Sequence, residues 1–181
     1  MTKSKEPRLF EIGHPASNYW LDWWDRLKQT KGDRAELRRC KNLKEVQLIS
    51  AYQRCYWASI NLWKKEKIKP SKEQMAIIIG LSAYVEDNDT EKKKDQKENQ
   101  QYDFLGYQIS RGDKPRLSEL RFRRLLKINN REKLFRFLIQ VIRIMDKKVN
   151  LLDLLRTAYF WGDNAKTNLA YQYYEKANLE N

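Results

Sequence analysis

A basic segment around residue 115 carries the side chains of this sequence that are best suited to binding chemistry. Residues 111–131 hold eight Lys and Arg side chains but only two carboxylates. Guanidinium groups stay charged at cellular pH, and their planar donors match the oxygens of a phosphate. The segment therefore indicates contact with a phosphate backbone. Its candidate binding residues are Arg116, Arg121, Arg123, Arg124 and Lys127.

The same segment has the pattern of a helix that is apolar on one side. If Ser118 caps the helix, a rotation of about 100° per residue places Phe122 and Leu125 in one arc and most of the cations opposite. The apolar arc would anchor the helix and leave the cations outward. Arg121 lies at the border between the two sides. The alternative is that these arginines pair with carboxylates elsewhere in the fold, and it applies most readily to Arg121.

A second basic cluster lies at residues 32–41. Asp33 is positioned as a helix cap, after which Arg34 and Arg38 recur one turn apart with Arg39 beside them. An ordinary solvated helix face would explain this cluster equally well. A third stripe follows the polar side of a later helix. It is weaker evidence for binding, because the exposed side of any helix must carry some polar residues. The stripe consists of Arg136, Gln140, Arg143 and Lys147, of which Arg143 is a candidate.

Composition sets the class of partner. The 181 residues include 37 Lys and Arg against 24 Asp and Glu, a net charge of +13, which favours nucleic acid or an anionic membrane surface. The longest apolar run, at 75–85, is well short of the roughly 20 residues that span a bilayer. The first residues lack the apolar stretch of a secretory signal, so we expect a cytoplasmic protein. Cys40 and Cys55 are expected to be reduced thiols.

Apolar residues recur at helical spacing along almost the whole chain. Trp20, Trp24 and Leu27 fall one or two turns apart, which predicts a buried helix face. A second helix is expected at about 43–66, and a capping-box spacing at Ser71 predicts the start of a third. The expected buried face of the second helix comprises Tyr52, Tyr56, Ile60 and Trp63. No segment alternates convincingly with a period of two.

The chain divides into two helical halves around a polar segment. Residues 87–101 contain no apolar side chain. They cannot bury surface to offset the entropy cost of ordering, which predicts a disordered charged linker. We expect a flexible N-terminal tail at 1–17, a helical bundle at 18–86 and a second bundle at 102–181. The predicted fold class is all-α, with two small helical-bundle domains joined by a polar linker.

Three strings in these segments resemble the CasB family, the small subunits of the type I-E CRISPR surveillance complex Cascade. They are "PRLSELRFRRLLKI", "GDRAELRRC" and "YFWG". The resemblance covers roughly 18–86 and 102–175, whereas the N-terminal tail and the charged linker have no counterpart in it. It implies an all-helical protein of two bundles that works as a pair of identical subunits in antiviral defence.

The resemblance also implies partners. A CasB-like protein would not be an enzyme. It would lie along the heteroduplex of guide CRISPR RNA and target DNA and would help to hold the displaced DNA strand of the R-loop. Its protein partners would be a second copy of itself and the large and backbone subunits of Cascade. The carried-over binding residues are those of the two basic clusters, and base reading is left to the guide.

Other classes of protein fit the sequence less well. A helical DNA-binding transcription regulator is the strongest competitor, but the basic residues are dispersed over both halves. A nuclease would need grouped carboxylates for metal or a histidine for proton transfer, and the single histidine, His14, falls in the expected tail. We therefore expect no catalytic residue, metal or cofactor. Trp57 and Tyr107 could stack on unpaired bases, although core placement is the favoured interpretation.

Overall fold

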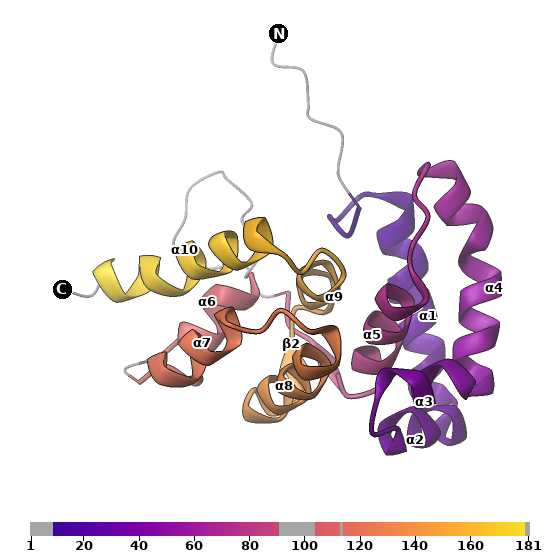
Figure 1. Ribbon diagram of the computed structural model, residues 1–181, viewed down its shortest axis with the longest axis horizontal. Coiled ribbons are helices and arrows are strands. Elements are labelled where there is room, and N and C mark those ends of the chain that lie inside the picture. Colours follow the sequence, from indigo (N-terminus) through magenta and orange to yellow (C-terminus); the bar gives the residue numbers. More distant parts are fainter. Residues whose placement is uncertain (1–8, 91–103, 113, 180–181) are drawn as a thin grey trace, which may run out of the picture.

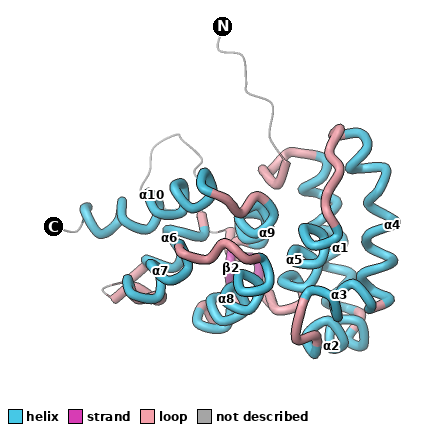
Figure 2. The backbone as a smooth tube through the Cα atoms, in the orientation of Figure 1, coloured by secondary structure: helices cyan, strands magenta, loops and turns pink. Residues whose placement is uncertain are grey.

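The computed structural model describes residues 9–90, 104–112 and 114–179 and is built almost entirely of helices (Figures 1 and 2). The prediction of an all-α protein is confirmed. The helices within the described residues are α1 Pro15–Gln29, α2 Lys31–Arg39, α3 Leu43–Leu48, α4 Ser50–Lys65, α5 Lys72–Ser82, α6 Leu105–Ser110, α7 Glu119–Leu126, α8 Arg131–Ile144, α9 Leu151–Tyr159 and α10 Asp163–Leu179. The strands are β1 Asp87–Asn88 and β2 Lys148–Val149. No helix in the described part is long and apolar enough to cross a membrane.

Helix α5 lies at the centre of the molecule. Every residue from Met75 to Ser82 is buried, because α5 packs against α3 on one side and against α8 and α9 on the other (Figure 1). The predicted capping box starts the helix: the Ser71 hydroxyl accepts from the Gln74 N–H, and the Gln74 side chain accepts from the Ser71 N–H. Since α5 contributes to both halves, one continuous core runs through the molecule. The bundle boundaries given above stay a prediction.

The start of the expected linker is folded, contrary to the prediction. Strand β1 pairs in parallel with β2, so that Asp87 lies opposite Lys148. The Asn88 side chain accepts from the Leu151 N–H at 2.9 Å, and Asp89 is buried. The partners that order these polar residues lie about 60 residues later in the chain. The prediction considered only the lack of apolar side chains within the segment, so it did not detect these contacts. The rest of the predicted linker, 91–101, lies outside the described residues.

The N-terminal tail was predicted to be flexible through residue 17, and this is wrong for residues 9–17. Leu9 and Phe10 are buried, and the Phe10 ring packs against aromatic rings of three helices, including those of Trp20 and Tyr159. His14 caps α1, since its Nδ1 accepts from the Ala16 N–H at 3.1 Å. The segment is therefore fixed by a buried apolar pair together with polar contacts, which include that of His14 with Glu66 at 3.1 Å. Residues 1–8 lie outside the described part.

The remaining helices are held mainly as expected. The face of α1 with Trp20, Trp24 and Leu27 is buried. The predicted helix at 43–66 is two helices, because Ile49 is extended between α3 and α4. Both cysteines are free thiols, as expected. Both are also buried, and burial raises the pKa of each thiol.

Candidate nucleic-acid interface

Helix α7 is anchored by its apolar side, as the sequence predicted. Phe122 and Leu125 are fully buried, and the Phe122 ring stacks on Tyr173 of α10 with 3.9 Å between ring centroids. The Tyr173 hydroxyl donates to the Leu117 carbonyl at 2.7 Å, which holds the chain just before α7. The opposite side of the helix is exposed. Ser118 occupies the cap position, but its side chain makes no capping hydrogen bond.

Three cations of α7 and its C-cap are exposed and carry no ion pair within the described residues: Arg121 and Arg124 in the helix and Lys127 at the cap. They follow one another at intervals of three residues, so each is the neighbour of the next on the helix surface. With a rise of 1.5 Å per residue, the row extends over about 9 Å of the helix axis. This row is a surface of unneutralised positive charge.

The other two candidates of this segment have acidic neighbours. Arg123 forms an ion pair with Glu119 at 2.7 Å, and Arg116 pairs with Asp146 at 2.9 Å. A hydrogen bond with Tyr174 and the charge of Glu119 raise the pKa of the Arg123 guanidinium. Both arginines are exposed, and ion pairs at exposed sites are weak, so both remain available to a phosphate.

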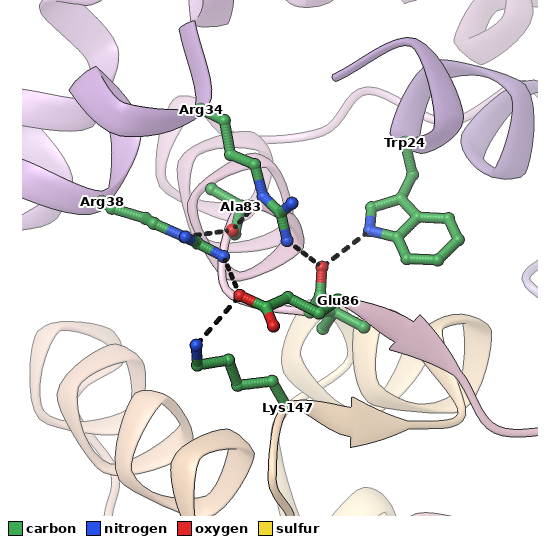
Figure 3. A network of polar contacts seen from close by, with 7 residues as sticks. Trp24, Arg34, Arg38, Ala83, Glu86 and Lys147 are labelled. Atoms are coloured by element: carbon green, nitrogen blue, oxygen red, sulfur yellow. Dashed lines mark hydrogen bonds and ion pairs between the residues drawn. The ribbon is translucent and has the colours of Figure 1, made fainter. Parts of the chain in front are cut away.

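Arg34 and Arg38, by contrast, turn into the protein at the end of α5 (Figure 3). The Arg34 guanidinium donates to the carbonyls of Ala83 at 2.9 Å and Val85 at 2.6 Å, and Arg38 donates to the Ala83 carbonyl at 2.7 Å. Ala83 is the C-cap of α5, whose carbonyl has no partner within the helix, and both arginines bind it; Val85 lies just after the helix end, so Arg34 also fixes the chain that leaves α5. Burial lowers the pKa of Arg34, and the charge of Arg38 lowers it further.

The same network joins the two halves of the chain at Glu86. One carboxylate oxygen of Glu86 accepts from Arg38 at 3.1 Å and from Lys147 at 2.9 Å. The hydrogen bond from Lys147 is the main reason that the pKa of Glu86 is lowered. The Trp24 indole also donates to the Val85 carbonyl at 3.2 Å (Figure 3). This part of the second cluster therefore has a structural explanation.

The cap predicted at Asp33 is also different in the structure. Helix α2 begins after Thr30, which places Asp33 in the first turn, where it pairs with Arg54 at 2.6 Å. Arg39 is exposed at the other end of α2 and has no ion pair among the described residues. The sequence identified the cations of α2 correctly but not which of them point outward.

The third stripe is mostly occupied by contacts within the protein. Arg136 pairs with Glu132 at 3.3 Å, and Lys147 is bound to Glu86. Arg143 is exposed and lies over the Tyr84 ring at 5.8 Å, a distance typical of a cation–π contact. Arg34 is held by backbone carbonyls, and the candidates without a side-chain hydrogen bond, ion pair or ring contact in the described part are Arg39, Arg121, Arg124 and Lys127. Binding by all nine candidates stays a prediction.

The favoured core placement of Trp57 is wrong, because 64% of this residue is exposed. Tyr107 is half-buried, and its hydroxyl donates to Glu175. The sequence did contain a signal for Trp57: the residue follows Tyr56 directly and so lies about 100° from the buried face of α4. The described residues contain no group of three or more His, Cys, Asp or Glu side chains that could hold a metal ion.

Comparison with known proteins identifies a family. The family model for CRISPR-associated protein Cse2 matches residues 33–174, which is well over half of the chain. The match includes α2 from Asp33 onward with its three candidate arginines, all of α7, and Glu86. No curated protein matches the chain.

Proposed function

The chain belongs to the CRISPR-associated protein Cse2 family, also called CasB, and from this premise we propose that the exposed cations of α7 bind a nucleic-acid backbone. The protein is a small subunit of the type I-E CRISPR complex Cascade, as the sequence predicted. Members of this family are non-catalytic structural subunits, so the prediction that the protein is not an enzyme is confirmed.

In the proposed function, α7 contacts phosphates and reads no bases. The observation that supports this proposal is the exposed row of Arg121, Arg124 and Lys127, which has no ion pair among the described residues and lies on a helix whose other side is buried. Phosphate contacts position a protein without conveying sequence, which suits a complex whose guide RNA supplies the specificity. Opening a DNA duplex against a guide is nearly balanced in free energy, so a few backbone contacts can shift the equilibrium.

Within Cascade, the subunit would contact the heteroduplex of guide RNA and target strand and would stabilise the displaced DNA strand. Arg39 on α2 is the further exposed cation that we include in this contact, while Arg34 and Arg38 have a structural role in holding α5. We extend the proposal to the protein partners: a second copy of the chain and the large and backbone subunits.

The test is a salt series with the purified protein, a labelled single strand and the matching duplex, both of arbitrary sequence. We expect the triple variant Arg121→Gln, Arg124→Gln, Lys127→Gln to flatten the dependence of log affinity on log salt. Three lost contacts correspond to a change in slope of up to about 2.7 on duplex DNA and about 2.1 on a single strand. A matched control removes three exposed lysines elsewhere: Lys69→Gln, Lys72→Gln and Lys133→Gln.

The control changes net charge by the same amount, so it separates a local contact from a general loss of positive charge. An equal change in slope for both variants would show that α7 is not a binding surface. Strong preference of the wild type for one duplex sequence would instead support a transcription regulator. In reconstituted Cascade, the α7 variant should slow R-loop formation on a matched target while the control does not.

A further inference from the structure

Helix α4 presents a large aromatic ring to solvent and holds it in place. Trp57 is 64% exposed, although Trp is usually well covered in folded proteins. Its indole N–H donates to the Gln53 side chain at 3.3 Å, and its ring meets Tyr56 edge-on with 5.4 Å between centroids. Tyr56 is stacked in turn on the buried Tyr52. The exposed ring is therefore supported from below, which reduces the entropy cost of binding to it.

Apart from Ala58, the other exposed residues of α4 are polar or cationic. The helix contains no Asp or Glu over its whole length, Ser50–Lys65. Asn61 is exposed one turn after Trp57, and Lys64 and Lys65 follow one turn later with no ion pair in the part of the chain that the structure describes. An anionic ligand with flat apolar groups matches this combination. Asp33, a carboxylate that approaches α4, is paired with Arg54. A helix without acidic residues of its own that presents an aromatic platform and flanking cations is typical of surfaces that bind single strands.

We propose that α4 carries a base-stacking site for single-stranded nucleic acid. In this site, Trp57 stacks on an unpaired base, and Lys64 and Lys65 contact the phosphates of adjoining nucleotides. The rise of an α-helix places Lys64 about 10 Å from Trp57 along the axis, within reach of the next phosphates of an extended strand. Every base has a flat face, so the site accepts any sequence, but it excludes a duplex, whose bases are already stacked.

This site is distinct from the row of cations on α7. In Figure 1 the molecule is drawn with its longest axis horizontal, and α4 and α7 lie toward opposite ends, with α5, α8 and α9 between them. The inference takes the class of ligand from the proposed function but uses none of the same residues. The site on α4 adds a preference for unpaired bases, which cations that contact only phosphates do not provide.

The test compares Trp57→Ala with Leu48→Ala in the full chain with α7 intact. Leu48 is 82% exposed at the end of α3 and serves as a matched control for loss of exposed apolar surface. The probes are a 20-nucleotide oligothymidine and a duplex of equal length. We expect Trp57→Ala to weaken binding of the single strand about tenfold and to leave duplex binding within twofold. Its salt dependence should not change, because no charge is removed.

Two further variants sharpen the result. Trp57→Phe should recover part of the lost affinity, because a smaller ring still stacks. Lys64→Gln with Lys65→Gln should flatten the salt dependence on the single strand by up to about 1.4. Because Trp57, Lys64 and Lys65 are all exposed, we expect every variant to fold as the wild type does, with the same Tm in thermal unfolding.

Unchanged single-strand affinity in Trp57→Ala would overturn the inference. If wild type binds nucleic acid through α7 and Trp57→Ala does so equally well, only the stacking site fails. If wild type binds neither probe, the proposed function fails as well. If Trp57→Ala binds the strand normally but no longer joins the other Cascade subunits, the surface of α4 is a protein interface and the stacking site is refuted.

Discussion

Substitution of Gly106 by alanine tests how closely α6 approaches α10. The Gly106 N–H donates to the Gln172 side chain at 3.2 Å. A Cβ at this position would lie 2.4 Å from the Gln172 Cβ and 2.9 Å from the carbonyl oxygen of Leu169. Neither atom is the free end of a side chain, so the two helices would have to separate.

The expected cost follows from these distances. Inserting a methyl group into a packed contact costs about 1–3 kcal/mol of stability, and the hydrogen bond to Gln172 would add about 1 kcal/mol if it were lost. The higher helix propensity of alanine offsets up to about 1 kcal/mol of this loss of stability. We therefore expect Gly106→Ala to lower the free energy of unfolding by about 1–3 kcal/mol. For a chain of this size, a loss of 2 kcal/mol lowers Tm by roughly 4–8 °C.

Gly32 is the matched control, because it is also helical but a Cβ added there would have no neighbouring atom within 4 Å. Gly32→Ala should leave stability unchanged or raise it by up to about 1 kcal/mol. Urea and thermal unfolding followed by far-UV circular dichroism would measure both variants. If Gly106→Ala is as stable as Gly32→Ala, the close packing of α6 on α10 is refuted.

Three further predictions concern hydrogen bonds. Arg34→Lys should lower the free energy of unfolding, measured in urea, by about 1–3 kcal/mol, because lysine lacks the planar fork that donates to two carbonyls. Arg39→Lys, at an exposed position, should leave it unchanged. Equal effects of the two substitutions would contradict the role of Arg34 at the end of α5. The pKa of Glu86 is lower in the folded protein than its usual 4.5, so its stabilising effect is complete above pH 4.5 and is lost as pH falls through the folded pKa. Glu86→Gln should remove that part of the pH dependence of the free energy of unfolding, and parallel curves for variant and wild type would contradict this. Tyr173→Phe should cost about 1 kcal/mol in chemical unfolding through its buried hydroxyl, while Tyr171→Phe, at a residue that is 75% exposed, should cost nothing.

Local patterns predicted the parts of the fold that depend on neighbouring residues. The capping box at Ser71 and the buried arc of α7 involve residues within a few turns of each other, and both are confirmed. The break at Ile49 was missed because the apolar spacing continues across it. Trp57 was assigned to the core on residue type, although its spacing from Tyr56 places it off the buried face of α4.

The partners of charged residues were beyond local patterns. Arg34 and Arg38 follow helical spacing as outward cations would, but they bind carbonyls 45 to 51 residues later in the chain. The same is true of the polar residues around β1, whose partners belong to the C-terminal half. In the candidate interface, therefore, the sequence predicted where positive charge is concentrated, and the structure separates the cations with internal partners from the exposed row on α7.

The central position of α5 affects how the chain folds during its synthesis. Helix α5 is complete at Ser82, yet α8 and α9, which cover it, end at residues 144 and 159. The contact of Phe10 with Tyr159 likewise cannot form until the ribosome has made residue 159. While the ribosome makes the intervening residues, at about 5–20 per second, the side of α5 that packs against α8 and α9 stays uncovered for several seconds. The side of α5 that faces α8 and α9 is covered only when α9 has left the ribosome, so a chain that ends before α9 exposes this apolar surface and is expected to aggregate.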